Sequence, residues 1–156
     1  MSQRGSSGPA PPPLQLSPEA AGSIRTEISR AGGREVSFLV EVGEDRILRG
    51  PRAVSRGNRT AVLVAAKGAP VGSLVLHNHP SGELEPSEAD LAVAGELYQR
   101  GLGTAIVDNR VTCLYVVVEP PPPRTVEPQD LDEMALVGFP TYKKAGKFSL
   151  GFSARF

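Results

Sequence analysis

The sequence has few of the features that mark secreted, disulfide-rich or membrane proteins. It has a single cysteine, Cys113, which excludes an internal disulfide framework and suits a reducing compartment. Its longest apolar runs have about six residues, far short of a membrane span. Residues 1–13 contain no apolar stretch of the kind that a signal peptide needs. We therefore expect a cytoplasmic protein without a membrane partner.

The sequence also lacks net charge. Its 17 basic and 17 acidic side chains cancel, so overall charge gives no reason to expect binding to nucleic acid, a membrane or a strongly acidic substrate. Any such partner would have to be recognised locally. A chain of 156 residues fits one domain with a single core.

The predicted domain occupies residues 17–119. Residues 1–16 are rich in Ser, Gly, Pro and Gln, and only Leu14 and Leu16 could join a core, which predicts a flexible leader. A capping serine and a proline then start a helix of roughly 14 residues, which ends at a glycine pair. Its apolar residues recur at helical spacing: Ala20, Ala21, Ile24 and Ile28.

Residues 35–42 alternate between two faces, which predicts a strand. A turn leads to a short strand around Ile47, and residues 49–59 are predicted to form an irregular connection. The apolar run 61–66 could be a strand or a helix; we favour a helix, because the strand 73–76 must follow at once.

The second half of the domain is predicted to contain a helix over residues 87–100 and strands over 104–107 and 111–118. Strands that alternate with helices and end in a hairpin indicate an α/β sandwich of two or three layers with a mixed sheet. Residues 120–123 predict a polyproline spacer, and residues 129–137 a short helix.

The tail, residues 139–156, combines four basic residues with four of the five phenylalanines and has no acidic residue. Basic charge among aromatics is typical of a docking or nucleic-acid-contact segment. Packing of the aromatics onto the domain explains the pattern equally well.

The residues with the clearest chemistry begin at the end of the strand 73–76. His77 and His79 are two residues apart, so both imidazoles project to one side and can reach one metal ion. Asp90, one helical turn after Ser87, can bring a carboxylate to the same point. Three protein ligands leave a fourth position for water, which is the arrangement of a catalytic zinc site.

Each part of this pattern also has a simpler explanation. Ser87-x-x-Asp90 alone is more often a helix capping box than half of a site, and an isolated His-x-His is weak evidence. The joint pattern favours a metal site, because all four side chains converge.

The series His77-Asn78-His79-Pro80, then Ser87 and Asp90, resembles the signature H-x-H-P-x6-S-x-x-D of JAMM (MPN) zinc metallopeptidases, and most of all their RadC-like members. The resemblance covers about residues 33–118. It implies a cytidine-deaminase-like α/β/α fold, zinc bound by His77, His79 and Asp90, and an oxyanion supported by Ser87. Asp108-Asn109 stands where RadC-like relatives usually have an Asp-His pair.

The resemblance further implies a glutamate on an upstream strand as general acid/base, a role that falls on Glu35. Periodicity alone leaves Glu35 and Glu41 open, because they share a strand face, while Glu44 lies in a turn. The expected function is zinc-dependent hydrolysis of an amide bond in a protein or peptide, with ubiquitin-like substrates and isopeptidase activity among the options. The alternative is a RadC-like module that binds a DNA-repair or helicase partner. Deaminase chemistry is excluded, because it needs H-x-E and P-C-x-x-C.

Overall fold

The computed structural model describes residues 9–122 and 153–155, and in this part of the chain three helices and a seven-stranded sheet are formed. The helices are α1 (Pro18–Arg30), α2 (Arg59–Lys67) and α3 (Glu88–Gln99). The strands are β1 (Gln15–Leu16), β2 (Ser37–Val42), β3 (Ile47–Ser55), β4 (Leu74–Asn78), β5 (Gly103–Val107), β6 (Cys113–Val118) and β7 (Ser153–Arg155). No helix of the described part is both long and apolar enough to cross a lipid bilayer.

The sheet has the order β1-β3-β2-β4-β5-β6-β7. The pairs β1–β3 and β4–β5 are parallel, whereas the other neighbours are antiparallel. The mixed sheet and the hairpin of its last two predicted strands, β5 and β6, are confirmed.

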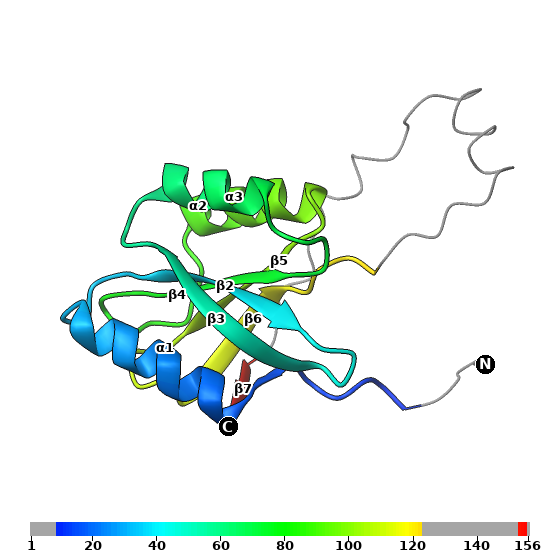
Figure 1. The fold of residues 1–156 in the computed structure, drawn as a ribbon, viewed down its shortest axis with the longest axis horizontal. Coiled ribbons are helices and arrows are strands. Elements are labelled where there is room, and N and C mark those ends of the chain that lie inside the picture. Colours follow the sequence, from blue (N-terminus) through cyan, green and yellow to red (C-terminus); the bar gives the residue numbers. More distant parts are fainter. Residues whose placement is uncertain (1–8, 123–152, 156) are drawn as a thin grey trace, which may run out of the picture.

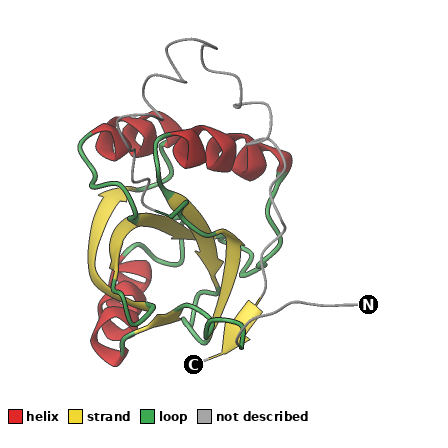
Figure 2. Cartoon of the chain, turned by 90° about the vertical axis from the view of Figure 1, so that its right-hand side faces the viewer, coloured by secondary structure: helices red, strands yellow, loops and turns green. Residues whose placement is uncertain are grey.

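Helices cover both faces of the sheet, with α1 on one side and α2 and α3 on the other (Figures 1 and 2). Alternating residues of β2 explain this arrangement, since successive side chains of a strand point to opposite faces. Phe38 packs in one core cluster with Ile24 of α1. Leu39 packs in another with Val62 of α2 and Leu97 of α3. The predicted α/β/α sandwich is therefore confirmed.

Helix α1 begins as its sequence predicts. The Ser17 hydroxyl oxygen accepts the backbone N–H of Ala20 at 3.0 Å, and Pro18 occupies the first helical position. Beyond the end of the helix, Gly32 and Gly33 adopt positive φ angles of 68° and 79°, which a glycine pair accommodates without strain.

The irregular connection predicted over residues 49–59 is wrong, because β3 runs on to Ser55. Leu39 pairs with Arg52 and Glu41 with Arg49, so two residues of β3 face one residue of β2 in a β-bulge. Gly50, with φ +64°, supplies the backbone conformation of that bulge. The composition of this segment, rich in glycine, proline and arginine, is thus typical of a loop, although the segment forms a bulged strand.

The leader predicted over residues 1–16 ends earlier than expected. Leu14 and Leu16 are only 1% and 5% exposed, and Leu16 pairs with Leu48 in the parallel pair β1–β3. Two leucines separated by one residue project to the same side, and β3 offers the edge on which they dock. Residues 14–16 therefore belong to the folded domain.

The predicted helix over 129–137 and most of the predicted spacer and tail lie outside the described residues. Pro120, Pro121 and Pro122 are described and follow β6 without regular structure. Within the tail, β7 pairs antiparallel with β6.

Candidate metal centre

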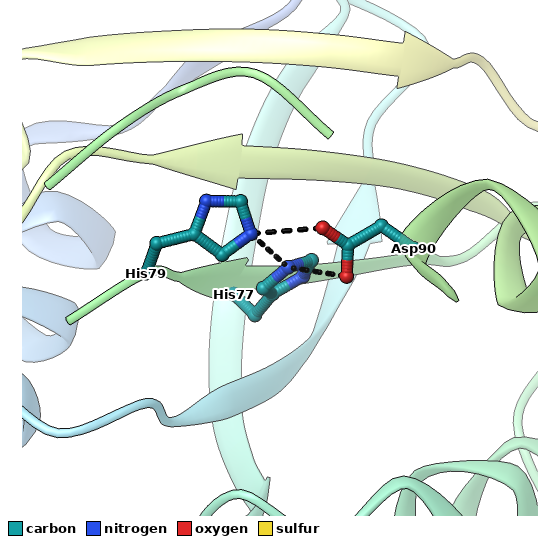
Figure 3. A group of neighbouring side chains, drawn as sticks. All are labelled: His77, His79 and Asp90. Carbon is teal, nitrogen blue, oxygen red and sulfur yellow. Dashed lines mark hydrogen bonds and ion pairs between the residues drawn. The ribbon is translucent and has the colours of Figure 1, made fainter. Parts of the chain in front are cut away.

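The three predicted metal ligands lie together where β4 ends and α3 begins (Figure 3). The Nε2 atoms of His77 and His79 are 3.2 Å apart. The Asp90 carboxylate spans both rings, with Oδ1 3.3 Å from Nε2 of His77 and Oδ2 2.8 Å from Nε2 of His79. One potential ligand atom from each residue therefore points to a common centre.

The orientation of the His79 ring is fixed by the loop that follows it. Its Nδ1 lies 2.9 Å from the Glu83 carbonyl oxygen, which can only accept, so Nδ1–H is the donor. In the neutral imidazole this leaves the lone pair on Nε2, facing His77 and Asp90. A backbone carbonyl that fixes the tautomer in this way is typical of histidines that bind metals.

The surroundings of Asp90 stabilise its ionised form. Burial alone would raise the pKa of its carboxyl group, but the neighbouring His77 ring, the backbone N–H of Ser87 and the His79 ring outweigh burial and hold the pKa well below its usual value. Oδ2 accepts the Ser87 N–H at 2.9 Å, at the N-terminus of α3, where the helix dipole also favours a negative charge. The carboxylate is therefore ionised at neutral pH.

This set of donors fits a zinc ion. Two imidazole nitrogens and a carboxylate oxygen are ligands that zinc accepts, and ligand atoms about 2.0–2.1 Å from a tetrahedral ion are separated by roughly 3.3 Å. The two imidazole nitrogens, 3.2 Å apart, match this value, and the Asp90 carboxylate approaches each ring with a different oxygen, Oδ1 at 3.3 Å from His77 and Oδ2 at 2.8 Å from His79. Lone pairs and a negative charge that converge so closely need a cation or a proton between them.

Ser87 serves α3 and the site at the same time. Its hydroxyl oxygen accepts the Asp90 N–H at 3.0 Å, and with the return bond from Ser87 N–H to Asp90 this forms a complete capping box. The capping interpretation of Ser87-x-x-Asp90 is thus confirmed, and it coexists with convergence on the histidines. Because the oxygen is the acceptor, the hydroxyl hydrogen remains available as a donor.

Glu35 lies at the same cavity as the cluster. The cavity of about 320 Å³ is lined by Glu35 together with His77, His79, Ser87 and Asp90. Glu35 and Asp90 are the carboxylates among its described lining residues. Glu41 lines a different cleft, beside Gly50, so the two glutamates that periodicity left open are separated by the fold.

Asn78, the residue between the two histidines, has a structural role that the sequence analysis missed. It is completely buried, and its Oδ1 accepts the backbone N–H of Val36 at 2.8 Å. Its Nδ2 donates to the Arg34 carbonyl at 3.0 Å and to Oδ1 of Asn109 at 2.8 Å. Its position between the two histidines could have indicated this role, because the Asn78 side chain must point to the opposite face of the strand from the histidines.

Asn109 extends this network to the histidine loop. Its Nδ2 donates to the carbonyl of Pro80 at 3.2 Å. Asn109 therefore connects Asn78 with the turn after His79.

Comparison with known proteins gives one family. Residues 43–112 match the family model described as the RadC-like JAB domain. This range includes the two histidines, Ser87 and Asp90, and it begins after Glu35. No curated protein matches the sequence. Among solved structures, the solution structure of protein DSY2949 from Desulfitobacterium hafniense is similar, with 16% identity, a TM-score of 0.47 and coverage of 67% of this chain and 84% of that chain.

Proposed function

We propose, from the RadC-like JAB domain that residues 43–112 match, that this protein is a zinc-dependent metallopeptidase or isopeptidase of the JAMM type. The observation that carries the proposal is the convergence of His77, His79 and Asp90 in a cavity that Glu35 and Ser87 also line. The substrate is an amide bond in a protein or peptide, and a ubiquitin-like C-terminus is one candidate.

His77, His79 and Asp90 would hold the zinc ion. When bound, zinc supplies a Lewis acid and lowers the pKa of a coordinated water to about 7. Asp90 contributes the negative charge, and the Glu83 carbonyl keeps the His79 lone pair directed at the centre. In the described part of the chain the cluster has three members, which favours an open, catalytic site over a closed, structural one.

Glu35 moves the proton. Its carboxylate takes a proton from the water whose oxygen forms the new bond to the carbonyl carbon, and passes it to the amide nitrogen as the C–N bond breaks. It suits this role because it lies at the cavity without belonging to the cluster of three ligands. The products are a carboxylic acid and an amine.

Ser87 stabilises the charge that develops on the carbonyl oxygen. Its hydroxyl oxygen is held by the Asp90 N–H, so the hydroxyl hydrogen can point into the cavity. A fixed donor of this kind stabilises a transition state more than a ground state. The rigid N-terminus of α3 thus orients both Ser87 and Asp90.

The activity test compares three forms of the protein on a tryptic peptide library and on a ubiquitin-like protein fused through its C-terminus to a reporter, with cleavage read by mass spectrometry. Zinc-loaded wild type is expected to cleave one of these substrates, whereas Glu35→Gln and His77→Ala are expected to be inactive. Cleavage that persists in both variants would identify a contaminant. Absence of cleavage by zinc-loaded wild type would favour the alternative, a module that binds a DNA-repair or helicase partner.

A further inference from the structure

The cavity at the metal cluster continues inward between the sheet and the helices α2 and α3. Its mouth carries the charged side chains: Arg59 opens α2, Asp90 lies in the first turn of α3, and Glu35 precedes β2. Each helix then leads away from the mouth. The inner wall is formed by the residues that follow along these elements and by strand residues on the same face: Val62, Val75, Val93, Leu97, Thr104 and Val117.

Two buried polar residues of the sheet line the cavity: Ser37 is opposite His77, at the level of the cluster, whereas Thr104 lies further in. Thr104 is 7% exposed, and its hydroxyl oxygen has no hydrogen-bond partner among residues 9–122 and 153–155. Buried hydroxyls in folded proteins are normally paired, so an unpaired one calls for an explanation. Because Thr104 lines the cavity, a group inside the cavity can supply the partner.

A local irregularity in the sheet occurs at the same place. Thr104 pairs with Val118 and Ala105 with Val116, so Val117 is the extra residue of a bulge in β6. Both Thr104 and Val117 line the cavity. Bulges are common beside functional sites, where they change the direction of a side chain.

The sheet register gives the depth of Thr104 below the reacting centre. In the parallel pair β4–β5, His77 is opposite Ile106 and Val75 is opposite Thr104. The hydroxyl therefore lies one two-residue strand repeat, roughly 7 Å, inward from the level of His77. A tyrosine side chain is roughly 6 Å long from its Cβ atom to its hydroxyl oxygen, so with a hydrogen bond of about 2.8 Å it can reach Thr104 from the level of His77.

We propose that this inner cavity is a specificity pocket that takes a tyrosine-type side chain, with aliphatic walls around the ring and Thr104 bonded to the phenol hydroxyl. The side chain belongs to the substrate residue next to the scissile amide bond, so the proposal rests on the function proposed above. A charged tip is excluded, because the inner wall offers no opposite charge and burial of an unpaired charge is costly. Serine and threonine side chains are too short to reach Thr104.

The test uses p-cresol as a probe of a tyrosine side chain and toluene as its matched control without the hydroxyl. Each is titrated into the full-length protein, with methyl NMR signals of Val75, Val93 and Leu97 as the readout. We expect p-cresol to shift these signals with a dissociation constant at least about fivefold lower than that of toluene, which corresponds to one neutral hydrogen bond.

Thr104→Val keeps the shape and removes the hydroxyl, so it is expected to abolish the preference for p-cresol, while Thr104→Ser is expected to retain it. If the valine variant does not fold, Thr104→Ala provides the same comparison. Equal binding of the two probes to wild type, or an undiminished preference in the hydroxyl-free variant, would overturn the proposal.

Titrations with and without zinc separate this proposal from the metal site. Occupancy of the pocket is expected in both states, and Thr104→Val is expected to bind zinc as wild type does. Binding of p-cresol that requires zinc would instead indicate coordination by the phenol oxygen and would contradict the pocket. If wild type does not bind zinc, the proposed function is contradicted. The comparison of p-cresol with toluene would still decide whether the pocket exists.

Discussion

Asn78 binds the main chain on both sides of Glu35: its Oδ1 accepts the Val36 N–H at 2.8 Å, and its Nδ2 donates to the Arg34 carbonyl at 3.0 Å. The residue between the two histidines therefore fixes the backbone of the proposed general acid/base. Val36 is also completely buried, so no water can replace the Asn78 amide at its N–H. Asn78 acts as a positioning residue.

Asn78→Ala is expected to lower the free energy of unfolding by about 2 kcal/mol, because the buried N–H of Val36 loses its partner. Asn109→Ala serves as the comparison and should cost less, since Asn109 is only partly buried and its partner Pro80 is also reachable by water. Urea unfolding of both variants measures the difference. Equal stability of the Asn78 variant and wild type would show that the amide is not needed.

Glu35→Gln keeps the size of the side chain and removes its ability to carry a proton. With the substrate found by the activity test, kcat should fall by about 100-fold or more, the usual range for general acid–base catalysis, while zinc binding stays unchanged. The matched control is Glu41→Gln, within β2 and at a different cleft, which should leave kcat unchanged. A larger loss in the Glu41 variant than in the Glu35 variant would reverse the assignment.

Leu16→Ala tests whether β1 belongs to the fold. Leu16 is 5% exposed, so its truncation is expected to cost about 2–5 kcal/mol of stability. Its exposed neighbour Gln15 provides the control, since Gln15→Ala should change stability by about 0.5 kcal/mol or less. Thermal unfolding, monitored by circular dichroism, separates the two variants. Similar melting temperatures would support the flexible leader that the sequence predicts.

Asp108 links stability to pH. Burial would raise the pKa of Asp108, but hydrogen bonds from the Thr112 hydroxyl and from the N–H groups of Cys113 and Thr112 lower it below the ordinary value of 3.8. The ionised form therefore stabilises the fold above pH 3.8, and this contribution is lost as the pH falls from 3.8 through the lower value of the folded protein.

Asp108→Asn should consequently be less stable than wild type at pH 7, with a difference that narrows as the pH falls below 3.8. Chemical unfolding at a series of pH values measures it. Glu44→Gln changes an exposed turn carboxylate and is the control. A stability difference that grows toward acid pH would contradict the assigned direction of the pKa shift.

Local rules predicted much of this fold. The capping serine and the proline defined the start of α1, and alternation in β2 assigned Phe38 and Leu39 to opposite faces. The His-x-His spacing and the Ser-x-x-Asp helix start likewise predicted that His77, His79 and Asp90 come together, because strand and helix geometry determine where those side chains point.

The features that were missed depend on contacts between distant segments. The course of β3 through Gly50 and Pro51 is set by its pairing with β2, which overrides the loop-like composition. The burial of Leu16 depends on the edge that β3 provides. The inner pocket at Thr104 arises only where β5, β6 and the two helices meet, so no local pattern indicates it.

Zinc titration into the metal-free protein, followed by calorimetry, tests the central claim that His77, His79 and Asp90 form a zinc site. We predict one zinc per chain for wild type and loss of binding in His77→Ala and Asp90→Asn, both of which should remain folded because the site lies on a preformed scaffold. Glu88→Gln, an exposed acid in the same turn of α3, is the control and should bind as wild type does. Wild-type zinc affinity in both ligand variants would contradict the account.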